Sequence, residues 1–397
     1  MVRCDRGGAM SAMEHVRYLA KTIGPRGSTT QNEALAARYA EEALRRAGLA
    51  PVTEPFTSAR SAWHPSALFT GLVLTSELLF LLAGRWGAVA GLVLAAAALA
   101  SMLQELAFRP NLLRKLLPKG QSQNVWVRLE PQGEVRRQVV LMGHLDSHRT
   151  PLAFSTDRWV RLFSTLVPAG LASVVVLILL FAAGALLPGA IWRWLSAPFA
   201  LVVAGVFLLT LQADFSPYTE GANDNATGAG VVLSLATRLQ AERLAHTAVW
   251  AVLSGCEEVG CYGADAFAAA HRAELGDAVW IAVDSVGGAG ADPSYLATET
   301  FLLTVKSDPG LAALFERICA RRPELNGHPS HMRGAYTEGA IGAKYGLRVL
   351  TLIGHRRDGA LPEWHRPTDV LDKVDVGLVE RTESLLWELV QEIDRGG

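Results

Sequence analysis

Four long apolar stretches limit what this chain can fold into more than any other feature of its sequence. They cover residues 66–83, 88–106, 162–187 and 195–212. Each has about 18 to 26 residues, enough for a helix to cross a hydrocarbon core of about 30 Å. They form two closely spaced pairs, which predicts two transmembrane hairpins, 64–109 and 158–212. The alternative, buried core helices of a large soluble protein, is disfavoured by this length and by the near absence of charge.

Tryptophans mark the turns of both predicted hairpins. Trp86 lies between the first two stretches, and Trp192 and Trp194 lie between the last two. Tryptophan is enriched at membrane–water interfaces, so these residues fit the tips of spanning hairpins. Glu77 lies inside the first stretch, where an acidic residue serves either a function or helix packing, and the sequence leaves both open.

Basic residues gather on the side where both hairpins begin and end. That side carries Arg60, Arg109, Arg114, Lys115, Lys119, Arg158 and Arg161. The two tips carry only Arg85 and Arg193. Because Lys and Arg concentrate in cytoplasmic loops, we expect a multi-pass integral protein of the cell membrane, with the lipid bilayer as a partner. The remainder of the chain is then expected in the cytoplasm.

Outside the hairpins, helical and strand patterns alternate. The remainder comprises residues 1–63, 110–157 and 213–397 and is expected to form one discontinuous domain. Strands are predicted at 124–129, 138–142, 247–253, 279–283, 301–305 and 347–353. Helices are predicted at 32–47, 227–239, 264–273, 311–321 and 376–393. This alternation predicts an α/β fold, a three-layer sandwich with a mostly parallel central sheet.

Charge and cysteine content exclude some classes of function. The net charge is −1, so no nucleic-acid partner is expected. Four cysteines are too few for a disulfide framework in a chain of 397 residues. We interpret Cys256 and Cys261 as buried thiols, since a local disulfide would need an oxidising compartment. The N-terminal segment, which includes Cys4, has no apolar run, and no cleaved leader is expected.

Metal-seeking side chains occur in five short motifs of the remainder. In chain order they are His144, Asp146, Asp224, Glu257, Glu258, Asp284 and His365. Three of the motifs follow predicted strands, and sites in open α/β sheets lie beyond the carboxyl ends of strands. Each motif alone is common, but together they supply about the set of nitrogens and oxygens that two zinc ions sharing a carboxylate need. The expected cofactors are therefore two zinc ions.

The spacing within these motifs suggests how the residues divide their roles. Asp146 lies two residues after His144, so in an extended chain it is on the same side and can orient a metal-bound imidazole. Glu257 and Glu258 are adjacent and face opposite ways, so one can bind metal while the other meets a water molecule. His148 has no such spacing argument, and we interpret it as structural.

Three runs of sequence resemble one known family. The runs Gly-Ala-Asn-Asp-Asn-Ala-Thr-Gly around Asp224, Ser-Gly-Cys-Glu-Glu ending at Glu258, and the run from His365 to Asp375 are similar to those of the dizinc aminopeptidases of metallopeptidase family twenty-eight. The resemblance covers most of the chain outside the hairpins. It implies the zinc-peptidase α/β fold and the hydrolysis of peptide bonds by an exopeptidase of the aminopeptidase type.

The resemblance also implies a role for each motif residue. One zinc ion would be held by His144, Asp224 and Asp284, and the other by Asp224, Glu258 and His365. Glu257 would be the general base, acting on a water activated by both ions. Asp146 would support His144 as a catalytic residue. The whole chain is then a membrane-anchored zinc metallopeptidase that takes a peptide substrate.

The sequence departs from the family pattern at two places. The second hairpin is inserted between His144 and Asp224, where relatives have a short loop. Family members often carry Ser-Asp and an aromatic residue before the last strand, and the nearest match here is Tyr336-Thr337-Glu338. We therefore name as candidate substrate-binding residues Tyr336, Arg333 and His331.

Two other functions remain open at this point. One is an aminoacyl cyclase related to glutaminyl cyclase, which in this family works with one metal ion. The other is an inactive peptide-binding or assembly protein that has kept the fold. The complete set of ligands favours hydrolysis, and an intact Glu257 disfavours an inactive protein. The sequence leaves open whether the protein is a homo-oligomer.

Overall fold

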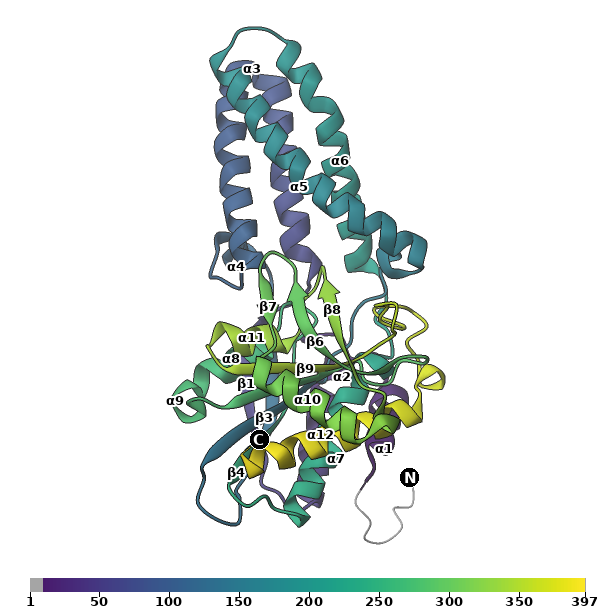
Figure 1. Cartoon of the computed structure of the whole chain (residues 1–397). Helices are drawn as coiled ribbons and strands as arrows, with labels where there is room; N and C mark the ends of the chain where they lie inside the picture. Colours follow the sequence, from purple (N-terminus) through teal and green to yellow (C-terminus); the bar gives the residue numbers. More distant parts are fainter. Residues whose placement is uncertain (1–9, 397) are drawn as a thin grey trace. The chain divides into compact units, whose positions relative to one another are not determined.

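The structure is a computed structural model that describes residues 10–396, and within this range the chain divides into two compact units (Figure 1). The first unit comprises residues 10–58, 120–148 and 218–396. The second comprises Ala59–Lys119 and Arg149–Pro217. Cys4 and the segment for which we expect no leader lie outside the described residues. The predicted hairpin boundaries differ by 5 to 10 residues from the edges of these units, and the domain boundaries stay predictions.

One mixed sheet forms the centre of the first unit. Within the described residues its strands are β1 (Val52–Ala59), β2 (Lys119–Leu129), β3 (Arg137–His144), β4 (Thr247–Ser254), β5 (Val279–Asp284), β6 (Asp292–Thr300), β7 (Thr304–Lys306), β8 (His328–Arg333) and β9 (Arg348–His355). Their spatial order is β1-β2-β4-β3-β5-β9-β6-β7, and β8 pairs with β6. Strands β4, β3, β5 and β9 run parallel. β2 pairs antiparallel with β4, and β6 pairs antiparallel with β9 and β7.

The prediction of an α/β fold is confirmed, but the sheet is mixed rather than mostly parallel. The parallel strands are those with continuous apolar runs, as expected for strands that are covered on both faces. The sequence analysis missed β1, β6 and β8, which lie toward the sides of the sheet. It also placed a strand at 301–305, whereas the structure begins β7 only at Thr304. The apolar residues before Thr304 form the turn between β6 and β7.

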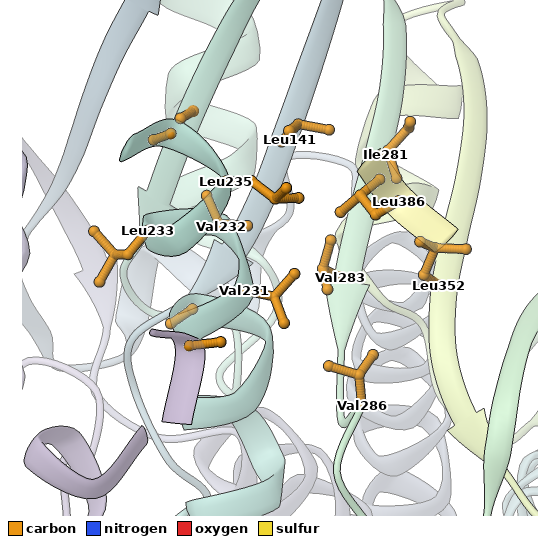
Figure 2. Close-up of a cluster of buried hydrophobic side chains, with 14 of the residues drawn as sticks. Leu141, Val231, Val232, Leu233, Leu235, Ile281, Val283, Val286, Leu352 and Leu386 are labelled. Atoms are coloured by element: carbon orange, nitrogen blue, oxygen red, sulfur yellow. The ribbon is translucent and has the colours of Figure 1, made fainter. Parts of the chain in front are cut away.

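Helices cover both faces of this sheet. They are α1 (Ala12–Arg17), α2 (Gln31–Arg46), α7 (Gly228–Ala241), α8 (Tyr262–Ala270), α9 (Arg272–Leu275), α10 (Pro309–Arg321), α11 (Glu338–Lys344) and α12 (Val376–Arg395). Figure 2 shows Val231 of α7 and Leu386 of α12 beside apolar side chains of β3, β5 and β9, all in one buried cluster. On the opposite face, Phe267 of α8 contacts Trp280 of β5. α11 packs there too, because a Cβ at its Gly342 would lie 2.7 Å from Trp280.

Local sequence explains where the longest of these helices begins. Asp375 caps α12, since its carboxylate accepts the backbone N–H of Leu378 at 3.2 Å. Buried side chains then recur with helical spacing at Leu378, Leu385, Leu389 and Ile393. The apolar face produced in this way packs into the cluster of Figure 2.

The second unit consists largely of three long helices, α3 (Trp63–Leu106), α5 (Asp157–Leu186) and α6 (Ile191–Phe215), with the short α4 (Leu112–Leu116). α3 contains a break at Gly84, whose φ of 57° and ψ of −127° are not helical. The two arms of α3 pack closely, because a Cβ at Gly87 would lie 1.8 Å from the carbonyl oxygen of Leu79. A Cβ at Gly91 would likewise lie 2.8 Å from the carbonyl oxygen of Ser76. α3 therefore folds back on itself at Gly84.

These three helices are, among the described residues, the ones long and apolar enough to cross a membrane. Glu77 of α3 is buried, and the hydroxyl of Ser196 on α6 donates to its carboxylate at 2.7 Å. This contact joins two helices, so Glu77 has a packing role within the unit. Its other carboxylate oxygen has no hydrogen-bond partner among the residues that the structure describes.

Candidate metal centre

The carboxyl ends of three neighbouring parallel strands bring the first site residues together. His144 is the last residue of β3, and Asp284 is the last residue of β5. β3 lies between β4 and β5, with His144 in register with Ser254 at the end of β4. Glu257 and Glu258 lie three and four residues after the end of β4. The parallel register therefore places all of them at one edge of the sheet.

One group of metal-seeking atoms forms around His144. Its Nε2 lies 3.4 Å from Oδ1 of Asp224, 3.7 Å from Oδ1 of Asp284 and 3.9 Å from Oε2 of Glu257. His144, Asp224 and Asp284 each present one ligand atom within 4.8 Å of the others. The three residues that the family resemblance assigns to one zinc ion are thus close together.

A second group forms around His365, on the loop before α12. Its Nε2 lies 3.5 Å from Oδ2 of Asp224 and 3.3 Å from Oε2 of Glu258. The two carboxylate oxygens of Asp224 therefore face two different histidines. This is the arrangement that a carboxylate shared by two cations requires.

His148 also belongs to the second group. Its ring stacks on that of His365, with centroids 3.5 Å apart and an interplanar angle of 10°. His148, Glu258 and His365 have one ligand atom each within 4.8 Å of one another. The sequence analysis interpreted His148 as structural, and the structure places its ring against His365, a candidate ligand. Nothing in the sequence near His148 signals this, because its partner lies more than two hundred residues away.

Asp146 supports both groups from behind. Its buried carboxylate lies 3.4 Å from Nδ1 of His144. It accepts the hydroxyl of Ser28 at 2.6 Å and the backbone N–H groups of Glu257 and Glu258 at 3.1 and 3.2 Å. Burial alone would raise the pKa of Asp146, but the contacts with His144 and these donors hold it below its usual value. Asp146 thus fixes His144 and the Glu-Glu pair as an ionised carboxylate.

A second buried carboxylate holds the turn that carries Asp224. Asp369 accepts the backbone N–H groups of Asn223 at 2.6 Å and Asp224 at 3.1 Å. Burial raises the pKa of Asp369 to about 8. The side chain of Asn225 also fastens the turn, because its Oδ1 accepts the backbone N–H of Ser285, next to Asp284, at 3.1 Å. The sequence analysis did not identify Asp369.

Arg26 is a further residue that the sequence analysis missed. It is fully buried, and among the described residues its guanidinium donates to backbone carbonyls. Among these are Leu145 at 2.8 Å, Glu220 at 2.6 Å and Gly221 at 2.9 Å. Burial lowers the pKa of Arg26 to about 10, and the nearby carboxylates, chief among them Asp369, oppose this change. Arg26 therefore brings a buried positive charge to the segments that carry His144 and Asp224.

Glu257 lies between the metal-seeking atoms and a thiol. Cys261 donates its S–H to Oε1 of Glu257 at 3.2 Å, while Oε2 faces His144. Burial and neighbouring carboxylates raise the pKa of Glu257 well above its usual value, although His144 opposes the change. Cys256 and Cys261 are both buried and free, in agreement with their interpretation as thiols.

The donor set fits divalent zinc. Nε2 of His144 and Oε1 of Glu258 are buried, and among the described residues neither has a hydrogen-bond partner. Burial and the carboxylates of Asp224 and Glu257 raise the pKa of Glu258 well above its usual value. Buried carboxylates at such short range repel one another unless a proton or a cation lies between them. Imidazole nitrogens and carboxylate oxygens are ligands that zinc accepts.

The contacts of the three predicted substrate-binding residues lie outside the two groups of metal-seeking atoms. His331 and Arg333 are exposed residues of β8, and Nδ1 of His331 lies 2.8 Å from the hydroxyl of Thr298. Tyr336 bonds to the turn between β6 and β7 through its hydroxyl. Their assignment to a substrate pocket stays a prediction.

Two other acidic residues lie buried close to that segment. Glu338 accepts the hydroxyl of Ser254, at the end of β4. Glu299 accepts the backbone N–H of Thr337 at 2.6 Å. Burial raises the pKa of both carboxyls to about 7. Glu338 stands in the Tyr-Thr-Glu run that the sequence analysis compared with the family's Ser-Asp, which was the only local signal for it.

Solved structures of zinc peptidases and of a cyclase share this fold. A leucine aminopeptidase precursor from Bacteroides thetaiotaomicron matches with a TM-score of 0.57 and 12% identity, covering 98% of this chain and 99% of that one. BSAP, a zinc aminopeptidase from Bacillus subtilis, matches with 0.57 and 14%, covering 98% and 96%. Tannerella forsythia glutaminyl cyclase matches with 0.56 and 14%, covering 97% and 98%. At these identities the likeness establishes the fold.

The sequence itself matches a family model. Residues 206–390 match the model described as Peptidase family M28. This stretch contains Asp224, Glu257, Glu258, Asp284 and His365, whereas His144 lies before it. None of the curated protein sequences matches the chain. This match to a little under half of the chain agrees with the family that its motifs resemble.

Proposed function

We propose that this protein is a membrane-anchored, two-zinc exopeptidase of the aminopeptidase type. The observation that carries the proposal is the position of Asp224, whose two carboxylate oxygens lie 3.4 Å from His144 and 3.5 Å from His365. His144 and Asp284 would hold one zinc ion, and Glu258 and His365 the other, with Asp224 shared. When bound, zinc would polarise a peptide carbonyl and make a water molecule a stronger nucleophile near neutral pH.

In this proposal Glu257 moves the proton. Its Oε2 faces the metal-seeking atoms, and Cys261 donates to its Oε1. A carboxyl whose pKa is raised by burial is suited to accept a proton near neutral pH. Glu257 takes a proton from the attacking water and returns it to the leaving amine as the peptide C–N bond breaks. Asp146 keeps the backbone of Glu257 in place through the N–H bond at 3.1 Å.

A peptide-library digest with the purified full-length protein tests the reaction. We expect products shortened from the amino end only, and a fall in kcat/KM of about 10²- to 10⁴-fold for Glu257→Gln. Zinc content should not change in that variant, because the proposed role of Glu257 is to move the proton rather than to hold zinc. Glu242→Gln, at an exposed carboxylate, is the matched control. Cleavage that survives Glu257→Gln at the wild-type rate would refute the assigned role.

A cyclase is the second candidate, because glutaminyl cyclases are among the proteins that share the fold. A cyclase would convert a peptide with N-terminal glutamine into its pyroglutamyl form and release ammonia, without cutting the chain. Metal content separates the candidates: two zinc ions per chain support the peptidase, one supports the cyclase, and none supports a peptide-binding protein. Mass spectrometry of a glutaminyl peptide after incubation distinguishes the products directly.

We further propose that α3, α5 and α6 anchor the protein in the cell membrane as two hairpins with the metal centre on the cytoplasmic side. The support is the length and apolar character of the three helices, together with the basic residues at the hairpin ends. A membrane-impermeant thiol reagent should label Trp86→Cys in intact cells. It should label Glu324→Cys, in the first unit, only after permeabilisation. The reverse pattern would invert the proposed topology.

A further inference from the structure

The turn between β6 and β7 has an unusual composition. β6 and β7 pair up to Thr300 and Thr304, so the turn consists of Phe301, Leu302 and Leu303. Tight hairpin turns favour Gly, Asn and Asp, because these residues adopt turn conformations easily. Here three large apolar residues stand in a row, with exposed fractions of 40%, 39% and 56%. We call residues 301–303 the apolar finger.

Tyr336 holds the apolar finger in a fixed shape. Its hydroxyl accepts the backbone N–H groups of Leu302 at 3.1 Å and Leu303 at 2.7 Å. The same hydroxyl donates to the carbonyl of Leu303 at 2.7 Å. The rings of Phe301 and Tyr336 are 6.2 Å apart. The backbone groups of the turn are therefore bonded within the protein, so apolar surroundings would leave fewer of them unpaired.

Basic side chains flank the apolar finger. Lys306 on β7 and Arg333 on β8 are exposed, and β8 runs beside β6 with Arg333 in register with Thr300. Apolar residues at a tip with Lys and Arg behind them are typical of segments that lie in the interface of anionic bilayers. The nearest acidic residue of the hairpin, Glu299, is buried.

We propose that the apolar finger inserts into the headgroup boundary of an anionic lipid bilayer. A bilayer is the partner that the rest of this chain favours, because three of its helices are long and apolar enough to cross a membrane. Phe301, Leu302 and Leu303 enter the acyl boundary, while Lys306 and Arg333 meet lipid phosphates. The proposal gives Tyr336 a new role, as the residue that shapes a membrane contact.

The root of the apolar finger is joined to the metal centre. Glu299, which precedes Thr300, accepts the backbone N–H of Thr337 at 2.6 Å. The next residue, Glu338, accepts the hydroxyl of Ser254, three residues before Glu257. A finger held by lipid therefore positions the site against peptides at the bilayer surface. This consequence for substrates rests on the proposed peptidase activity, whereas lipid contact rests only on the proposed membrane anchoring.

Site-specific labelling of the full-length protein in vesicles tests the contact. Leu302→Cys, in a Cys4→Ser, Cys319→Ser background, carries an environment-sensitive nitrobenzoxadiazole label. Gln132→Cys, at an exposed site of the first unit, is the matched control. In vesicles of phosphatidylcholine and phosphatidylglycerol, headgroup-borne nitroxide should quench the label at 302, and aqueous iodide should quench the label at 132. Equal iodide quenching at both positions overturns the proposal, whether or not the protein proves to be a peptidase.

A triple variant, F301S/L302S/L303S, tests the consequence for activity. We expect kcat/KM for a lipid-tethered peptide to fall about fivefold or more, with soluble peptides changed less than about twofold. Leu35→Ser, at an apolar residue of α2 with 40% exposure, is the control. An equal loss on both substrates would make the finger the lip of a substrate pocket. A change in oligomeric state would make it a contact between copies, and either result overturns the proposal.

Discussion

The two halves of the metal centre are built in different ways. His144 ends a central strand, so the register of the sheet fixes its backbone. His365 lies on a loop, with a left-handed φ of 54°, and the ring of His148 stacks against it. The imidazole of His144 therefore has a carboxylate, Asp146, behind it, whereas the imidazole of His365 has a second imidazole ring against it.

The electrostatic surroundings of the two histidines differ as well. Burial alone would lower the pKa of His144, but the carboxylates of Glu257, Asp146, Asp224 and Asp284 hold it well above its usual value. Burial and the neighbouring His148 hold the pKa of His365 well below its usual value. A proton therefore competes with a cation more strongly at His144. We therefore expect metal binding at the half that contains His144 to be more sensitive to acid than metal binding at the half that contains His365.

The largest effect should come from the residue that both halves share. Asp224→Asn reduces the charge of the carboxylate that faces both histidines, and we expect bound zinc and peptide hydrolysis to be lost together. Metal analysis by mass spectrometry, alongside the peptide assay, measures both. Asp358→Asn, at an exposed carboxylate, should leave both unchanged. A variant at 224 that keeps two zinc ions would show that the halves are independent.

Substitutions that act mainly on one half of the site should have a smaller effect on zinc binding. Asp146→Asn keeps the size of the residue that supports His144 but weakens the hold on its imidazole, so we expect zinc affinity to fall about 10- to 100-fold. His148→Ala should act instead on the half that contains His365. Because Asp146 also bonds the backbone of Glu258, zinc titration of the metal-free Asp146→Asn protein should show the larger loss at the site that contains His144 and a smaller loss at the other. In His148→Ala the larger loss should be at the site that contains His365. Equal weakening of both sites by Asp146→Asn would contradict the distinction drawn between them.

The smallest effect concerns the stability of the metal-free protein. Folded Asp369, with a pKa of about 8, keeps a proton that the unfolded chain releases at its usual pKa of 3.8. Its contribution to stability is therefore complete below that value and is lost as pH rises toward 8. We expect the stability of the metal-free protein to fall with rising pH, by on the order of a few kcal/mol between pH 5 and 8.

Unfolding with denaturant across this pH range measures the slope, and Asp369→Asn should flatten it. Asp146→Asn should leave that slope in place, because the pKa of Asp146 is lowered rather than raised. The ionised carboxylate of Asp146 stabilises the folded protein, so this contribution to stability is lost as pH falls. If the slope is unchanged in Asp369→Asn, then other buried carboxyls with a raised pKa, such as Glu33 and Glu338, cause it.

The sequence predicted those site residues that lie next to a local apolar pattern. His144, Asp284 and the Glu257–Glu258 pair lie within a few residues of the ends of apolar runs that predict buried strands, and the structure brings them together at one edge of the sheet. Arg26, His148 and Asp369 could not be found in this way, because their partners are distant in sequence. Their roles are set by tertiary contacts that leave no periodic signal.

The same reasoning explains the errors in the fold. Continuous apolar strands such as β4 and β5 were predicted within a residue or two of their observed bounds. β8 was missed, because its six residues alternate between buried and exposed and include two histidines and a proline. The apolar residues 301–303 suggested a strand although they form a turn, since apolar composition alone does not distinguish a buried segment from an exposed tip.

The contacts of Arg26 join the two segments of the first unit between which the second hairpin is inserted. Arg26 bonds Leu145 on one side of that insertion and Glu220 and Gly221 on the other. The backbone N–H of Thr219 also donates to the carbonyl of His148 at 3.0 Å. The residues of the first unit that precede and follow the insertion thus lie side by side. A few linking residues in place of 149–217 would therefore join these two ends, and α3 would remain as the long apolar helix of the shortened chain.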